Sequence, residues 1–554
     1  MARNVPPTVL GSATDPGITA MVTRRTFIRT FAAAGATLAL RPLDALGRAA
    51  GPATVGFGVH PFIEDHPDAV FILRTSVAAK TDGPAIRQAG LGFGRSAFIP
   101  RAVEAGGLPL TSPVAIKPNL TCRMSSDPRY TIEGTMGIVT DCYFVEGLIE
   151  SLKELGLAGS QFHLREVSCP VDFADSGYTS MAQRTGAELR DMSAKVDSLP
   201  PGDVQWVEVP NGVWFRRIPF LQPVNSPGAW LLNVAKLKTH AMGLTLCAKN
   251  LQGAIAHNYQ AHCVAYSGTM DVPASDLNPD AKAVILANYN RHVAAGIPRW
   301  ARPGDDGGLW QETWATRCLD NNLVTRPGLH IIEGIYGRDG HFIDGPSPEG
   351  LATDTMTNVN IFGRNAFHVD IVGTWLAGHE PGNLGLFHLA IERGLSWALN
   401  PMSIPVYEWQ ADGSASPRAL TEFSRTPLKT YYLRRDYAGQ SEPYWHLLDE
   451  SFDYGTTAVE GADAGRDAAF GLRQSHANPV RGSVSIEFAI PRPAGVRLEV
   501  CSVLGEVVDV LVDDHRMKGS HVVVWNAARR PPGVYFCRLM SGGLSQTSKL
   551  ILVR

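Results

Sequence analysis

The chain has 554 residues, of which 44% are hydrophobic and 19% charged, and its formal net charge is −3 at pH 7. This length exceeds one ordinary domain, and the composition is that of a folded globular protein and not of a disordered chain. The near balance of acidic and basic residues gives no general attraction to a polyanion, so we expect no nucleic-acid partner.

The first 50 residues are predicted to be a targeting segment and not part of a folded domain. The run TRRTFIR at residues 23–29 is followed by the short apolar run FAAAGATLAL. Together they resemble a twin-arginine export signal, with Arg24 and Arg25 as the pair. The apolar run is too short to span a bilayer. The resemblance implies contact with the twin-arginine export machinery and an exported protein, either periplasmic or at the cell surface or secreted.

The main domain is predicted over residues 51–400, with residues 401–454 as a segment that covers it. Five apolar runs have the length and composition of strands: residues 69–76, 112–120, 161–168, 230–235 and 329–337. Residues 140–156 have helical spacing, with Thr140 as N-cap and Gly156 as the stop, and residues 358–378 read as a strand followed by a helix. Strand, helix, strand in this order predicts an α/β fold with a mostly parallel sheet and flanking helices.

Polar residues follow these strands at the points where the strands end. Open α/β sheets bind ligands at the carboxyl ends of parallel strands, so we expect these side chains to lie near one edge of the sheet. The predicted ligand-binding residues are Lys117, Asn119, Lys236, Lys249, Asn250 and Glu333.

Residues 230–255 contain the densest group of reactive side chains. Because side chains alternate along a strand, Lys236, Lys238 and His240 should emerge on one face. Residues 209–270 contain no Asp or Glu, although 53 acidic residues in 554 would place about six there. Unless carboxylates from elsewhere lie over this region, its positive field favours a small anion such as a carboxylate or phosphate.

The runs AKLKTH and AKNLQG in this region resemble the core of the family called domain of unknown function 362 (DUF362). The runs AIKPNL, REVS, IIEGIYGRDG, DGPSPEG and NAFHVDIVGTWLAGHEP follow the same family pattern in order. The resemblance covers residues 70–396 and implies no established activity. Asp370 matches an Asp of the family. It is either a ligand or catalytic acid, or a carboxylate that stabilises the first turn of its own helix.

Two functions of different classes are open. In the first, an exported enzyme acts on a small anionic substrate, and its predicted catalytic residues are His240, Lys238, Glu166 and Asp370. The lysines would bind the anion, a histidine would transfer a proton, and an acid would orient that histidine or hold a metal. In the second, a non-catalytic surface or periplasmic protein binds or adheres to a ligand.

A divalent metal is the one cofactor that the sequence suggests. His240, His257 and His262 are its predicted ligands, with Glu166 or Asp370 completing a mixed nitrogen and oxygen site. The histidine spacing is irregular, so satisfied or surface histidines are the alternative. The eight cysteines form no CxxC pair, so the usual iron–sulfur and structural zinc spacings are absent.

The C-terminal part has a different pattern. Residues 455–475 are small, acidic and unpatterned, which predicts a linker, and residues 476–554 contain short alternating runs typical of a β-sandwich. The runs ANPVRGSVSIEF, LGEVV, PPGVYFCRL and KLILVR resemble the immunoglobulin-like domain of flagellar hook-capping proteins and of type IX secretion cargo. The resemblance implies outer-membrane secretion machinery as a partner, or an adhesion or spacer role. Cys501 and Cys537 are either a disulfide or two buried thiols.

Overall fold

The computed structural model describes most of the chain beyond the predicted export signal, which lies outside the described residues. The description covers residues 54–553 except 121–128, 168–172, 245, 261–265, 269, 302–306, 348–349, 432–433, 436–449, 455–470, 475–482, 491–493, 504–505, 517–518, 528–529 and 542–543. Within this part, a small compact unit contains residues 54–58 and 100–110, and a second unit contains the remainder.

The small unit is built on a three-stranded sheet. Its strands are β1 (Val55–Val59), β3 (Phe98–Ala102) and β4 (Leu108–Pro109), in the order β3-β1-β4. β1 and β4 are antiparallel, with Gly56 opposite Pro109. A side chain at Gly56 would overlap the Leu108 carbonyl oxygen, so this close approach of two strands requires glycine.

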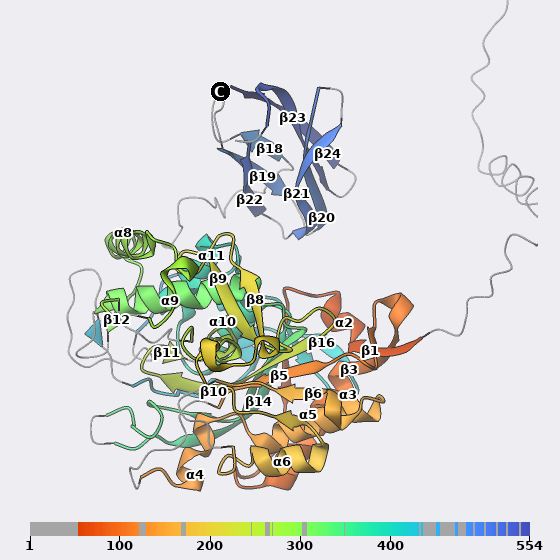
Figure 1. The fold of residues 1–554 in the computed structure, drawn as a ribbon, viewed down its shortest axis with the longest axis vertical. Coiled ribbons are helices and arrows are strands. Elements are labelled where there is room, and N and C mark those ends of the chain that lie inside the picture. The colour runs from red at the N-terminus through yellow and green to blue at the C-terminus, as the bar shows by residue number, and fades with distance from the viewer. Residues whose placement is uncertain are drawn as a thin grey trace, which may run out of the picture. The chain divides into compact units, whose positions relative to one another are not determined.

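A ten-stranded sheet forms the centre of the second unit (Figure 1). Its strands are β2 (Val70–Arg74), β5 (Val114–Pro118), β6 (Phe162–Leu164), β7 (Glu188–Leu189), β10 (Trp230–His240), β11 (Gly243–Leu244), β13 (Leu329–Arg338), β14 (Asp354–Gly363), β15 (Val406–Trp409) and β16 (Ala415–Pro417). The order is β16-β15-β2-β14-β13-β10-β5-β6-β7, and β11 pairs with β10. The strands from β13 to β7 are mutually parallel, as are β15 and β2, whereas β14 and β16 are antiparallel to their neighbours. The predicted α/β class with a mostly parallel sheet is confirmed.

The order of strand addition reverses between β5 and β10. From β5 the chain adds β6 and then β7 on one side, through α5 (Cys142–Glu154) and α6 (Tyr178–Thr185). It then returns to place β10 and β13 on the other side of β5. Such a reversal opens a crevice at the carboxyl ends of the two central strands, which is where open α/β sheets bind ligands.

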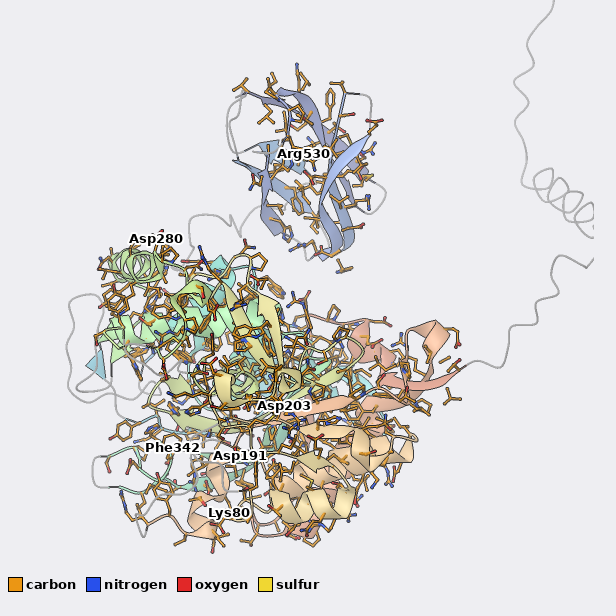
Figure 2. All side chains as sticks on the ribbon, viewed as in Figure 1. Lys80, Asp191, Asp203, Asp280, Phe342 and Arg530 are labelled. Carbon is orange, nitrogen blue, oxygen red and sulfur yellow. The ribbon has the colours of Figure 1, made fainter. Side chains whose placement is uncertain are left out.

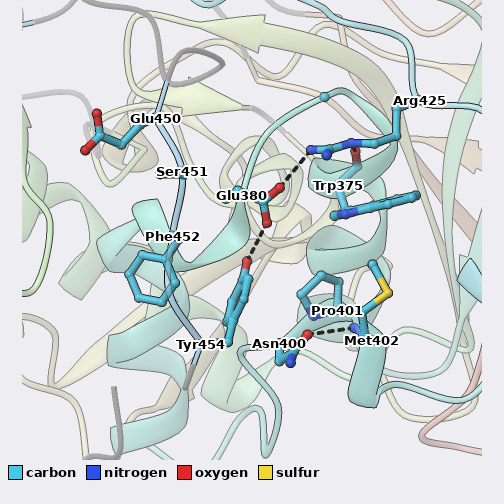
Figure 3. Close-up of a pocket in the computed structure, with 11 residues that line it drawn as sticks. Trp375, Glu380, Asn400, Pro401, Met402, Arg425, Glu450, Ser451, Phe452 and Tyr454 are labelled. Atoms are coloured by element: carbon cyan, nitrogen blue, oxygen red, sulfur yellow. Dashed lines mark hydrogen bonds and ion pairs between the residues drawn. The ribbon is translucent and has the colours of Figure 1, made fainter. Parts of the chain in front are cut away.

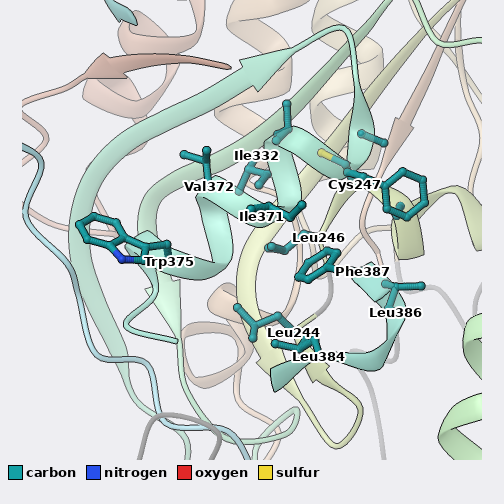
Figure 4. Close-up of a cluster of buried hydrophobic side chains, with 14 of the residues drawn as sticks. Leu244, Leu246, Cys247, Ile332, Ile371, Val372, Trp375, Leu384, Leu386 and Phe387 are labelled. Carbon is teal, nitrogen blue, oxygen red and sulfur yellow. The ribbon is translucent and has the colours of Figure 1, made fainter. Parts of the chain in front are cut away.

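Helices cover both faces of the sheet. On one face, α3 (Gly83–Ala97) packs with α5, and the Phe93 ring meets Phe362 of β14 edge-on at 4.8 Å between centroids. On the other face, α7 (Cys247–Asn250), α9 (Gly308–Val324) and α10 (Ala366–Leu376) share one buried apolar cluster with the central strands (Figure 4). The remaining helices and strands of this unit are α2 (Pro61–Glu64), α4 (Ile132–Thr135), α8 (Ala281–Ala294), α11 (Gly385–Glu392), β8 (Val204–Glu208), β9 (Arg217–Leu221), β12 (Trp300–Ala301) and β17 (Arg434–Arg435).

The start of α5 differs by one residue from the prediction. Asp141 and not Thr140 is the N-cap, and its Oδ1 accepts a hydrogen bond from the Tyr143 backbone N–H at 2.9 Å. The Thr140 hydroxyl instead accepts from the Asn119 N–H and donates to the Val234 carbonyl, both at 2.9 Å. Thr140 therefore joins the carboxyl end of β5 to β10.

The C-terminal part is a sandwich of two antiparallel sheets. One sheet has the order β18-β19-β22 and the other β21-β20-β23-β24. Their strands are β18 (Gly471–Gln474), β19 (Ser483–Ile490), β20 (Ala494–Cys501), β21 (Val507–Arg516), β22 (Gly519–Asn526), β23 (Gly533–Ser541) and β24 (Leu544–Leu552). Cys501 and Cys537 are buried free thiols, so the disulfide alternative is not what the structure contains.

Two predicted boundaries change in the structure. β18 lies within the predicted linker, because its four residues complete a sheet by pairing with β19. Part of the predicted covering segment, β15 and β16, extends the main sheet beyond β2. Among the described residues, no helix has the length and apolarity needed to cross a bilayer.

Candidate functional site

Lys117 lies at the end of β5 in a buried ion pair. Its ammonium donates to the Glu166 carboxylate at 2.7 Å, to the Pro118 carbonyl at 2.6 Å and to Asn250 Oδ1 at 3.2 Å. The side chains of Lys117 and Glu166 are 1% and 3% exposed. Burial lowers the pKa of Lys117, and the Glu166 charge opposes that shift. All three N–H bonds of the ammonium are therefore used within the protein.

Asn250 connects this pair to the middle of β10. Its amide nitrogen donates to Asn233 Oδ1 at 2.8 Å and to the Lys117 carbonyl at 3.0 Å. The Asn233 amide nitrogen in turn contacts the Cys247 carbonyl and His330 Nδ1, both at 2.9 Å. Burial lowers the pKa of His330 to about 3, so this imidazole is neutral and can accept. Asn233 and His330 were not predicted, because they lie inside apolar runs and carry no motif.

Gly253 packs directly against the Lys117–Glu166 pair, which offers a test of how tightly the pair is enclosed. A Cβ at this position would overlap the Glu166 carboxylate and lie 2.6 Å from Lys117 Cε. We expect Gly253→Ala to destabilise the fold by about 1–3 kcal/mol through overpacking, measured by urea unfolding. Gly202→Ala is the matched control, since a Cβ there has no atom within 4 Å. Equal stability of the two variants would show that the Lys117 and Glu166 side chains can shift to accommodate the added methyl group at little cost.

Lys236 forms a second buried cluster on the opposite face of the sheet. Its ammonium donates to Glu333 at 2.7 Å and lies 3.3 Å from the centroid of the Tyr336 ring. The Tyr336 hydroxyl donates to Asp141 Oδ2 at 2.8 Å, and the Asp141 backbone N–H donates to Glu333 at 3.3 Å. Because this set faces α5, we call Asp141, Lys236, Glu333 and Tyr336 the α5-face cluster. Asp141 and Tyr336 were not predicted.

The predicted ligand-binding residues are thus divided between two faces. Asn233 and Lys236 are three positions apart on β10, and alternation along a strand places their side chains on opposite sides. Register agrees, because Asn233 is beside Lys117 on β5 and Lys236 is beside Glu333 on β13. One converging group was expected, and the structure has two.

Lys238 lies beyond the α5-face cluster at the carboxyl end of β10. Its ammonium donates to Asn119 Oδ1 at 3.1 Å and to the carbonyl of Ile138. Since Asn119 follows β5, this contact spans the reversal between β5 and β10. Lys238 and the predicted partner Asn119 are therefore brought together, and both are buried.

His240 ends β10 next to an aromatic group that the sequence did not reveal. Its ring meets the His341 ring edge-on at 4.4 Å and the Phe342 ring at 5.4 Å, measured between centroids. Phe342, labelled in Figure 2, has a φ of 57°. This left-handed conformation is strained for a bulky side chain, and such strain is concentrated at functional sites. His341 and Phe342 follow β13 by a few residues, so only the parallel pairing of β10 and β13 brings them to His240.

Both imidazoles accept a backbone N–H at Nδ1. Met242 N–H donates to His240 at 3.2 Å, and Ala241 N–H donates to His341 at 3.3 Å. A neutral imidazole that accepts at Nδ1 carries its proton at Nε2. His240 and His341 are therefore held as Nε2–H donors, which suits an anion.

His240 does not have the contacts expected of a metal ligand. A ligating imidazole donates its second N–H to an acceptor, whereas His240 Nδ1 accepts a hydrogen bond. His262 lies outside the described residues, and the Nδ1 of His257 has no hydrogen-bond partner in the described part of the chain. Within that part, no three His, Cys, Asp or Glu side chains are placed to hold a metal ion.

Asp370 stabilises a helix other than its own. Its two carboxylate oxygens accept the backbone N–H groups of Cys247 and Ala248 at 2.7 and 2.8 Å, at the start of α7. Its own helix, α10, is capped by Asn365. Of the two alternatives for Asp370, neither describes these contacts, because the loop before α7 brings backbone N–H groups to the carboxylate. Burial raises the pKa of Asp370 to about 7.

Carboxylates from elsewhere in the fold do lie over the acid-free region. Glu166 neutralises Lys117 and Glu333 neutralises Lys236, because their strands flank β5 and β10. Lys249 of α7 is different, since no described residue gives its ammonium a hydrogen bond or an ion pair, and its charge lowers the pKa of Lys117. The net positive field is smaller than the sequence suggests and is concentrated on fewer lysines.

A cavity of about 640 Å³ lies at the end of α10 (Figure 3). Arg425 stacks on the Trp375 ring at 4.6 Å and pairs with Glu380 at 3.1 Å, and Glu380 accepts the Tyr454 hydroxyl at 3.1 Å. Arg425, Glu380 and Tyr454 thus bind one another. The predicted site residues are not among the described residues that line it, so this cavity is distinct from the strand-end site.

Two known protein families match the chain. The family described as "Domain of unknown function (DUF362)" matches residues 114–375, which contain both strand-end clusters and Asp370. The family described as "Secretion system C-terminal sorting domain" matches residues 477–553, within the β-sandwich. No curated protein matches the chain. The chain therefore carries a DUF362 domain followed by a type IX secretion sorting domain, and it is an exported protein of the cell surface or the secreted fraction.

Proposed function

We propose that this exported protein binds a small anionic molecule, a carboxylate or phosphate, where β5 and β10 end. The observation that carries the proposal is the buried Lys238 ammonium at the reversal of strand order, beside His240. Its contacts with Asn119 Oδ1 and the Ile138 carbonyl fix this positive charge at the end of β10. Charge-assisted hydrogen bonds to an anion are among the strongest that a protein forms.

The surrounding groups support an anion and not a cation. His240 and His341 are fixed as Nε2–H donors by their contacts at Nδ1. On the other face of the sheet, Lys249 adds a positive charge near Lys117 that no described carboxylate neutralises. The strained Phe342 packs against His240, which is consistent with a binding site whose shape is imposed by its surroundings.

A catalytic version of this proposal gives His240 the role of a hydrogen-bond donor to the reacting anion. As a neutral imidazole it would keep its Nε2–H and hydrogen-bond the developing charge, Lys238 would stabilise the same charge, and Glu166 and Asp370 would hold Lys117 and helix α7 in place. The non-catalytic version rests on a different observation. The pairs Lys117–Glu166 and Lys236–Glu333 are closed ion pairs, which are typical of a static framework.

Binding is tested by calorimetric titration of the folded chain with a panel of small carboxylates and phosphates. For a ligand that binds, we expect Lys238→Met to raise Kd by about 10-fold to 150-fold, the equivalent of one charged hydrogen bond. Lys282→Met on the exposed side of α8 is the matched control and should leave Kd unchanged. An unchanged Kd in Lys238→Met would refute this location.

The two versions are separated by His240→Gln. If the protein is an enzyme, the rate of turnover of the bound anion should fall far more than the protein's affinity for that anion. Equal losses of turnover and affinity, or no turnover of any anion that binds, would support the non-catalytic binding function.

A further inference from the structure

The α5-face cluster contains two carboxyl groups but one ammonium. Lys236 and Glu333 are fully buried, and Asp141 and Tyr336 are no more than 5% exposed. If both carboxyl groups were ionised, the cluster would hold an uncompensated negative charge away from water. Such a charge is costly in a low dielectric, and uptake of one proton removes it. We propose that Asp141 and Glu333 hold one proton between them at neutral pH, as a buried acid–base pair.

Charged groups outside the cluster are engaged by other partners. The Lys238 ammonium donates to Ile138 and Asn119, and Asp354 is paired with Arg338 at 2.7 Å and with Lys80 at 2.8 Å. The charge of Asp141 acts on two further titratable groups, Cys142 and Tyr178. Both are neutral, because burial raises the pKa of each. None of these groups supplies the second positive charge through a direct contact with the cluster.

The hydrogen bonds indicate where the proton resides. Glu333 accepts from the Lys236 ammonium, from the Ile335 N–H at 3.1 Å and from the Asp141 N–H, so its ionised form is favoured. Asp141 Oδ1 accepts the Tyr143 N–H at 2.9 Å, and its Oδ2 is bonded to the Tyr336 hydroxyl, which accepts as well as donates. That contact survives when Asp141 carries the proton and donates it to Tyr336. The proton therefore belongs mainly to Asp141, with Glu333 as its charged partner.

The two carboxyl groups titrate as one unit. Burial raises the pKa of both, and the charge of Asp141 raises that of Glu333 further, whereas Lys236 lowers both. Removing either carboxyl should therefore release the proton from the other. This coupling distinguishes a shared proton from two independently buried acids.

The pair lies next to the proposed anion site without depending on it. Lys236 and Lys238 are two residues apart on the same face of β10, about 7 Å along the strand. The negative charge of an anion bound at Lys238 would disfavour ionisation of the nearby carboxyl groups. Binding of the anion should therefore be accompanied by uptake of protons from solution. The protonation itself can be measured without any ligand, so its failure would leave the anion site untouched.

Infrared spectroscopy of the full folded chain at pH 7 tests the proposal, because a protonated carboxyl has a C=O band that a carboxylate lacks. Asp370, with a pKa of about 7, contributes to that band, so the comparison is made in the Asp370→Asn background. We expect a remaining C=O band that disappears when Asp141→Asn is added. We expect the same loss with Glu333→Gln, because Asp141 then ionises beside Lys236.

Two outcomes would overturn the proposal. Loss of only carboxylate bands in Asp141→Asn would mean that both acids are ionised, and a band that survives Glu333→Gln would mean that Asp141 is protonated alone. Asp320→Asn is the matched control, since it removes another buried acid and should leave the cluster band unchanged. Tyr336→Phe retains both carboxyl groups and should shift the band, which gives a readout even if Asp141→Asn fails to fold.

Discussion

Replacing Lys236 with methionine should destabilise the main domain by about 3–5 kcal/mol. The ammonium is fully buried and compensates Glu333 at 2.7 Å, with Asp141 close by. Without it two buried carboxyl groups are left in the α5-face cluster with no ammonium to compensate them. Urea unfolding followed by far-ultraviolet circular dichroism measures the loss. Because Asp141 and Glu333 can take up protons, the loss should shrink as the pH is lowered toward 5.

A double variant separates the pair from general damage to the core. Lys236→Met combined with Glu333→Leu removes both members of the ion pair and should be more stable than Lys236→Met alone. Lys282→Met controls for the loss of a lysine at the surface, where we expect a change within about 0.5 kcal/mol. A Lys236→Met variant as stable as the parent chain would show that the cluster is hydrated.

The Asp370 carboxyl should make stability fall as the pH rises. Its folded-state pKa is raised to about 7, against about 3.9 for an unfolded chain. Between these values the folded state binds more protons than the unfolded state. The contribution of Asp370 is therefore fully present below pH 4 and is lost as the pH rises through 7, a change of about 4 kcal/mol in the free energy of unfolding.

The variant Asp370→Asn isolates this effect. It cannot ionise, so the difference in unfolding free energy between parent and variant should decrease from pH 4 to pH 7 and stay constant above pH 8. Asp271→Asn is the matched control, because that side chain is 71% exposed and its removal should leave the profile unchanged. A parent-minus-variant difference that is flat with pH would mean that Asp370 is ionised throughout.

Local patterns in the sequence were sufficient for the main elements. The apolar runs at residues 112–120 and 329–337 became β5 and β13, and the helical spacing after Thr140 became α5. Binary patterning determines element type because burial of one face or stripe is the main driving force. Short elements without such a pattern were missed: β18, β15 and β16 exist because they complete sheets built by other strands.

The candidate site depended on tertiary structure to a greater degree. Alternation along β10 correctly placed Lys236, Lys238 and His240 on one side, with Lys238 and His240 both facing Phe342. Their partners Asp141 and His341 come from distant segments. They meet these residues only because α5 begins over the sheet and β13 pairs in parallel with β10.

Residue type, spacing and strand ends are properties of the chain alone, so the DUF362 core, the sorting domain and the lysines at the ends of strands could be recognised from sequence. Charge compensation is a property of neighbours in space. The acid-free run around Lys117 and Lys236 looked strongly positive, yet Glu166 and Glu333 reach it from adjacent strands. Which lysines retain charge for a ligand was decided by strand order and by the face on which each side chain emerges, and only the folded sheet determines both.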